Sequence, residues 1–169
     1  MHLAIEALAL IDDESITLDV YGEGPEKARL LEQARELGVD GRVRFAGTVP
    51  YGKPFYEAIA QYDIMLLTNL NREQPRLVFD AIACGVILLC PNNESYQPLN
   101  LHQTMLFDTG NARAIANAIA ACQEAGTRWA VFQQIAHLAH DHTVDAMHSR
   151  RLHWLSESGL IESNDSGHP

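Results

Sequence analysis

The residues best suited to chemistry lie in a short polar loop between two apolar segments. The loop, at 72–75, follows a nearly apolar run at 63–68 and leads into a helical pattern at about 76–84. In open parallel α/β sheets, a loop that joins the carboxyl end of a strand to the start of a helix is where anionic ligands bind. Glu73 adds a carboxylate to this loop, and Asp80 lies one turn into the helix. We therefore predict a ligand site here, and its chemistry favours a phosphate-bearing molecule.

Two charged side chains of this helix stand four residues apart. Arg76 and Asp80 can both project toward whatever the loop holds. A guanidinium suits a diphosphate, although at this spacing Arg76 could equally serve only as an ion-pair partner for Asp80. Asp80 is also favoured at a first helical turn by the helix dipole alone. Both interpretations therefore stay open for each residue.

A second candidate lies where an earlier strand ends. The alternating, β-rich segment 16–21 is followed by Gly22 and Gly24, with Pro25 at the start of the next helix. The two glycines would let the backbone approach a ligand closely. A tight turn between a strand and a helix requires the same conformational freedom, so this pattern alone does not decide between the two.

Three motifs of the chain resemble one family. The run 73–86 resembles the nucleotide-sugar-binding signature, roughly E-x7-E-A-x-A-x-G-x-P, of GT-B glycosyltransferases of the "glycosyl transferases group 1" type. Residues 20–25 and 38–47 resemble that family's G-x-G-P turn and its G-V-x-x-R-V-x-F-x-G strand. Residues 61–67 resemble its x-A-D-x-x-L-x-P-S strand. The motifs keep the family's order and approximate spacing, and they cover about residues 1–125.

The resemblance implies roles for the two acids. Glu73 would be the catalytic carboxylate near the donor sugar, and Asp80 would bond the ribose hydroxyls with a side chain one methylene shorter than the family's glutamate. A strict eight-residue offset from Asp80 falls on Arg72, so either the loop is one residue shorter or Arg72 has replaced the acid.

The resemblance also implies a donor-binding surface made largely of backbone. Amides at the helix start would hold the diphosphate or sugar hydroxyls, and Arg76 would partly replace a basic pair that the family carries upstream of the matched segment. The turn at Gly22 and Gly24 and the backbone at Thr48 and Val49 would lie near the base. The donor-binding set is therefore Asp80, Arg76, Gln74, Pro75, Leu77, Gly22, Gly24, Thr48 and Val49.

The resemblance implies that this chain is the donor-binding, C-terminal half of a retaining GT-B enzyme. Such an enzyme transfers a hexose from a nucleoside diphosphate sugar to a hydroxyl acceptor. We expect no cofactor and no metal, and we expect an N-terminal acceptor-binding domain or subunit as partner. The isolated chain should bind nucleotide weakly and turn over little. The alternative is a non-catalytic sugar-nucleotide-binding or partner subunit of a split glycosyltransferase. An unrelated nucleotide-dependent activity, such as epimerisation, would need a second catalytic group that we do not identify.

The elements that must position these residues alternate between strands and helices. We expect strands at 16–21, 42–46, 63–68, 86–90 and 104–108, and helices at 3–11, 25–37, 76–84, 110–124, 128–140 and 143–158, with a short helix ending at residue 60. This order predicts an α/β fold, a Rossmann-like three-layer α/β/α sandwich with a mostly parallel sheet. We expect one domain at 1–160, which lacks the family's first strand, and a disordered tail at 161–169. An exposed apolar edge left by that strand would indicate either a partner or a truncated chain.

Composition excludes several classes of function. The net charge is −10, with 12 basic and 22 acidic residues, which disfavours nucleic acid as a partner. No apolar run is long enough to span a membrane, and the amino-terminal segment lacks signal-peptide features. The three cysteines have no metal-ligand spacing, so we expect reduced thiols in a cytoplasmic protein. The histidines at 137, 140 and 142 lack a completing ligand set, and Asp19 and Asp63 are interpreted as structural.

Overall fold

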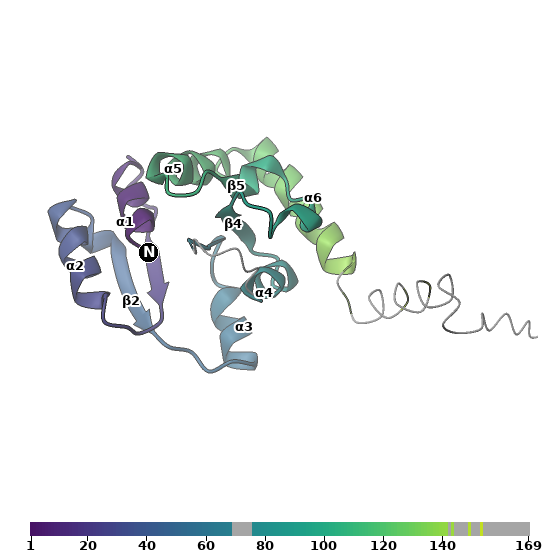
Figure 1. Cartoon of the computed structure of the whole chain (residues 1–169), viewed down its shortest axis with the longest axis horizontal. Coiled ribbons are helices and arrows are strands. Elements are labelled where there is room, and N and C mark those ends of the chain that lie inside the picture. Colours follow the sequence, from purple (N-terminus) through teal and green to yellow (C-terminus); the bar gives the residue numbers. More distant parts are fainter. Residues whose placement is uncertain (69–75, 142, 144–148, 150–152, 154–169) are drawn as a thin grey trace, which may run out of the picture.

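Helices and strands alternate along the computed structural model, which describes residues 1–68, 76–141, 143, 149 and 153 (Figure 1). The expected Rossmann-like α/β class is confirmed, and the paired strands are all parallel. In chain order the elements are α1 (His2–Ala9), β1 (Leu18–Tyr21), α2 (Lys27–Glu36), β2 (Val43–Gly47), α3 (Lys53–Ile59), β3 (Ile64–Leu66), α4 (Leu77–Ala83), β4 (Ile87–Pro91), β5 (Leu106–Phe107), α5 (Ala112–Ala121) and α6 (Ala125–Asp141).

The strands pair as two separate parallel sheets. Among the described residues β1 pairs only with β2, and β3, β4 and β5 form the second sheet in that order. Leu18 is opposite Val43 in the first sheet, and Met65 is opposite Leu88 in the second. Figure 1 shows the two parts, with β2 beside α2, and β4 beside α4 and α6. The expected sheet is thus divided between β1 and β3.

A cavity of about 620 Å³ lies between the two sheets. Its walls are mostly apolar and come from β1, from β3 with the two residues that follow it, and from α3. A run as apolar as that at 63–68 predicts a parallel strand covered on both faces, and this is wrong: all three β3 residues are only half-buried. The physical reason is that β3 borders the cavity, whereas β4, which has a strand on each side, is buried at every residue.

α1 joins the two hydrophobic cores of the molecule. Its residues Leu3 and Ala7 pack into the larger core, around β4 and α5, while Ile5 and Leu8 pack into a smaller one with Ala34 of α2. A helix eight residues long can do this because its apolar residues are not confined to one stripe. The two sheets are therefore held together through a shared helix rather than through backbone pairing.

The observed elements are mostly shorter than the sequence predicted, and the differences have local causes. A 3-10 turn at Gln103–Met105 occupies the first part of the predicted fifth strand, which leaves only two paired residues in β5. Another 3-10 turn, Asp40–Arg42, precedes β2, and Arg42 donates to the carbonyls of Ile11, Asp13 and Ile16.

The C-terminal predictions are only partly covered by the structure. α6 packs against α4 and β4, as expected for a helix on the flank of the sheet. The predicted helix at 143–158 and the predicted tail lie almost entirely outside the described residues. Among those residues, no helix combines the length and apolar character that a membrane crossing requires.

Candidate functional site

Asp80 is a buried carboxylate in which one oxygen accepts hydrogen bonds and the other has no donor among the described residues. The side chain lies on α4, and the residue is 5% exposed. Its Oδ1 accepts hydrogen bonds from the hydroxyls of Tyr51 and Tyr56, each at 3.1 Å. Its Oδ2 is buried and has no hydrogen-bond partner in the described part of the chain. Because a buried charge is costly unless it is hydrogen-bonded, Oδ2 is suited to accept a hydrogen bond from a ligand hydroxyl.

The two tyrosines belong to an aromatic cluster at the start of α3. Their hydroxyls are 2.7 Å apart, and the two rings meet edge to face with centroids 5.7 Å apart. The hydrogen bond with Tyr51, burial, and the nearby charge of Asp80 all raise the pKa of Tyr56, so its hydroxyl stays protonated and remains a donor. Gly52, with φ of 113°, makes the turn that brings Tyr51 back over α3. Sequence reasoning missed both tyrosines, since no local pattern connects positions 51 and 56 with position 80.

Arg76 lies over the ring of Tyr51. Its guanidinium carbon is 4.2 Å from the ring centroid, a cation–π contact that leaves the side chain exposed. The interpretation of Arg76 as an ion-pair partner of Asp80 is not what the structure shows, because the contacts of Asp80 among the described residues are the two tyrosine hydroxyls. Arg76 therefore presents its positive charge to solvent beside the buried carboxylate.

The other predicted site residues fall into three groups. Leu77 and Val49 both line the cavity, so the start of α4 and the segment after β2 meet there. Thr48 and Gly24 are exposed, and Gly22 has φ of 124° and donates its N–H to the carbonyl of Gly47 at 2.7 Å. That amide continues the pairing of β1 with β2. The catalytic candidate Glu73 and the donor-binding candidates Gln74 and Pro75 lie outside the described residues.

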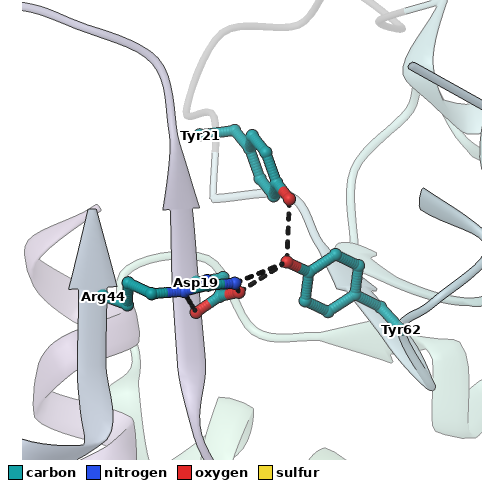
Figure 2. Close-up of polar contacts among 4 residues, drawn as sticks. All are labelled: Asp19, Tyr21, Arg44 and Tyr62. Carbon is teal, nitrogen blue, oxygen red and sulfur yellow. Dashed lines mark hydrogen bonds and ion pairs between the residues drawn. The ribbon is translucent and has the colours of Figure 1, made fainter. Parts of the chain in front are cut away.

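A second polar cluster links the two sheets through side chains (Figure 2). Asp19 of β1 accepts hydrogen bonds from Arg44 of β2 and from Tyr62, which lies just before β3. The hydroxyl of Tyr62 is 2.8 Å from that of Tyr21, and the two rings are perpendicular. The Asp19 side chain is 11% exposed, whereas that of Arg44 is 70% exposed. The structural interpretation of Asp19 agrees with these contacts.

The Asp19 cluster leads to a prediction about acid stability. The hydrogen bond from Arg44 lowers the pKa of Asp19 most, the bond from Tyr62 and the charge of Arg44 also lower it, and burial opposes them. A carboxyl whose folded pKa lies below its unfolded value near 3.8 stabilises the protein above that pH. This contribution is lost as the pH falls through the lower, folded value. We expect Asp19→Asn to lose less stability than the wild type between about pH 5 and pH 2.

Urea unfolding followed by circular dichroism at several pH values in this range would measure the effect. Asp63→Asn is a matched control, because Asp63 is exposed and pairs with Arg128 elsewhere on the surface. Equal acid sensitivity of Asp19→Asn and wild type would contradict the prediction.

The remaining residues singled out in the sequence have structural contacts. Asp63 pairs with Arg128 at 2.6 Å, and His137 pairs with Asp141 one turn along α6. All three cysteines are free, and burial raises the pKa of Cys90 to about 12. The described residues hold no group of three or more histidine, cysteine, aspartate or glutamate side chains that could bind a metal ion. His142 lies outside them.

Comparison with known proteins connects this geometry to a family. The model of the family described as Glycosyl transferases group 1 matches residues 1–124. The lipopolysaccharide core biosynthesis glycosyltransferase LpsE of Rhizobium meliloti (strain 1021) is 29% identical over 120 residues, which are 70% of this chain and 34% of LpsE.

Two solved structures establish the fold. HepE of Anabaena, solved with UDP, aligns with a TM-score of 0.76 at 23% identity, over 93% of this chain and 45% of HepE. The catalytic domain of a cholesterol-α-glucosyltransferase from Helicobacter pylori aligns with a TM-score of 0.70 at 20% identity, over 83% of this chain and 89% of that domain. The chain thus spans about a third of LpsE and just under half of HepE.

Proposed function

The chain belongs to the Glycosyl transferases group 1 family, and from this premise we propose that it binds the nucleoside diphosphate sugar donor of a retaining hexosyl transfer. The observation that carries the proposal is the carboxylate of Asp80, buried on α4 with its Oδ2 unpaired among the described residues. A ribose hydroxyl that donates to Oδ2 would supply the missing hydrogen bond. The structures of HepE with UDP and with UDP-glucose support a uridine nucleotide as the first ligand to test.

In the proposed mechanism, each region of the site has one task. Asp80 orients the ribose, and the exposed guanidinium of Arg76 stabilises the charge that develops on the leaving diphosphate, which is electrostatic catalysis. Val49 and Leu77 both line the cavity, and the backbone after β2 is proposed to contact the base there. Glu73 is proposed to orient the donor sugar near its anomeric carbon. The hydroxyl acceptor would approach from a second domain.

The first prediction of this proposal concerns the chain by itself. We expect calorimetric titration of the 169-residue protein to detect weak binding of one nucleotide among UDP, GDP and ADP, tested with their sugars. We expect little or no transfer of hexose, because the groups that bind and activate the acceptor would come from a second domain. A robust transfer rate from this chain alone would contradict the expectation, and the absence of binding to every nucleotide would contradict the proposed function itself.

The alternative function is that of a donor-binding subunit of a split enzyme. The chain spans about a third of LpsE and just under half of HepE. Such a subunit would bind the same nucleotide, and transfer would appear only when a separate acceptor-binding polypeptide is added. Sedimentation of the chain with that polypeptide, with and without UDP, would distinguish a subunit from an independent binding protein.

A further inference from the structure

Two opposite charges lie one turn apart at the start of α4 without forming an ion pair. Arg76 and Asp80 are four residues apart, and the N–H of Asp80 donates to the carbonyl of Arg76, so helical geometry places both side chains on one face. Within the described residues, Oδ2 of Asp80 nevertheless has no partner, and Oδ1 accepts only from tyrosine hydroxyls. A buried carboxylate with a free oxygen should attract a guanidinium within reach. Some other contact must therefore hold Arg76 away from it.

Tyr51 makes that contact, and it touches both charged groups. The face of its ring lies against the guanidinium of Arg76, with 4.2 Å between the ring centroid and the guanidinium carbon. Its hydroxyl, at the edge of the ring, donates to Oδ1 of Asp80 at 3.1 Å. The face and the hydroxyl of a tyrosine point in different directions. The two contacts of Tyr51 therefore separate the opposite charges.

The ring contact of Arg76 is weak enough that losing it would change where the guanidinium lies. A cation–π contact at an exposed site and an exposed ion pair between helix residues four apart are of similar strength. Arg76 is exposed, and Tyr51 is 53% exposed. Asp80 is buried, however, so a guanidinium that reached its unpaired oxygen would form a stronger, charge-assisted hydrogen bond. Without the ring of Tyr51, the ion pair is therefore the favoured arrangement.

We propose that Tyr51 is a positioning residue that prevents an ion pair between Arg76 and Asp80 and so keeps both groups available to the nucleotide. The inference rests on the proposed function, in which Asp80 accepts from a ribose hydroxyl and Arg76 faces the diphosphate. An ion pair would occupy Oδ2 and would withdraw the positive charge from the diphosphate. Tyr56 shares the contact with Oδ1, whereas the cation–π contact with Arg76 is made by Tyr51. Of the two tyrosines, Tyr51 is therefore the one that acts on both groups.

The test asks whether removing Tyr51 reverses the effect of a substitution at Arg76. UDP is titrated calorimetrically into the 169-residue protein and its variants Arg76→Gln, Tyr51→Ala and the double variant. In the wild type, we expect Arg76→Gln to weaken UDP binding at least about threefold, because a charge beside the diphosphate is lost. In the Tyr51→Ala background, we expect the same substitution to strengthen binding at least about threefold, because it frees Asp80 from the ion pair. Tyr51→Phe keeps the ring and should bind UDP at least about fivefold more tightly than Tyr51→Ala.

Tyr56→Phe is the matched control, because it removes a hydroxyl from the same oxygen of Asp80 and leaves the ring of Tyr51 against Arg76. In this background, Arg76→Gln should weaken binding as it does in the wild type. Circular dichroism checks that each variant is folded. Tyr51→Leu, which keeps an apolar contact with Phe55, takes the place of Tyr51→Ala should the alanine variant be unfolded.

Arg76→Gln that weakens UDP binding in the Tyr51→Ala background, or leaves it unchanged, would overturn the proposal. Equal affinities of Tyr51→Phe and Tyr51→Ala would overturn it too. The same holds if Arg76→Gln has no effect in the wild type, because Arg76 would then not face the diphosphate. A wild-type chain that binds none of UDP, GDP and ADP would instead contradict the proposed function, and if GDP or ADP is the nucleotide that binds, the same series is measured with it.

Discussion

Replacing Asp80 by alanine is expected to weaken the binding of UDP by at least about tenfold. One oxygen of Asp80 accepts from two tyrosine hydroxyls, and the other is buried without a partner among the described residues. A hydrogen bond to a charged group contributes about 1.5–3 kcal/mol, which corresponds to roughly ten- to more than a hundredfold in affinity. Calorimetric titration of the wild type and the variant with UDP under the same conditions would measure the change.

Two control variants separate a lost ligand contact from a disturbed site. Asp80→Ala also leaves the hydroxyls of Tyr51 and Tyr56 without their acceptor, so thermal unfolding of the variant must be measured alongside binding. Tyr56→Phe removes one of those hydroxyls and keeps the carboxylate, and we expect it to retain most of the affinity. Asp63→Ala removes an exposed carboxylate outside the site. UDP affinity of a folded Asp80→Ala protein equal to that of the wild type would exclude Asp80 from the binding site.

The second large effect concerns stability. Leu88→Ala in β4 should lower the free energy of unfolding by about 2–5 kcal/mol, because Leu88 is fully buried and the neighbouring strands can close around the lost side chain only in part. A typical domain is stable by only about 5–15 kcal/mol, so the loss is a large fraction of the total. Urea unfolding followed by circular dichroism would measure it.

Leu37→Ala is the matched control for this measurement. It makes the same chemical change at the end of α2, where the leucine is 41% exposed, and we expect it to cost less than about 1 kcal/mol. Equal losses at the two positions would show that β4 is not the centre of the core.

The sequence predicted the fold class because two kinds of signal indicate the same elements along most of the chain. These are the hydrophobic periodicity within each segment and the glycine and proline residues at the segment ends. Gly38 and Gly85 have positive φ at the ends of α2 and α4, where helix stops were predicted, and the run at 86–90 is fully buried in β4. These signals come from residues that lie close together in the chain, so they can be read from a single sequence. Element ends were less predictable, since no local pattern separates the 3-10 turn at 103–105 from the start of a strand.

Of the candidate site, sequence reasoning found Asp80 and Arg76 but not their surroundings. The motif marks both positions at the start of α4, yet the residues that contact them, Tyr51 just before α3 and Tyr56 within it, have no local signal that points to this role. The division of the sheet between β1 and β3 was not foreseen either, although an exposed edge was expected. Pairing between distant segments is a tertiary property, which local periodicity does not carry.

The position of α1 has a consequence for how this protein matures on the ribosome. α1 packs against α5, which ends at Ala121. The residues of α1 that belong to the larger core therefore stay uncovered until more than a hundred further residues have been translated. At about 5–20 residues per second, that interval lasts roughly 5–20 s. Nascent chains of this protein therefore expose an apolar segment throughout that interval, and we expect chaperones that act during translation to bind it.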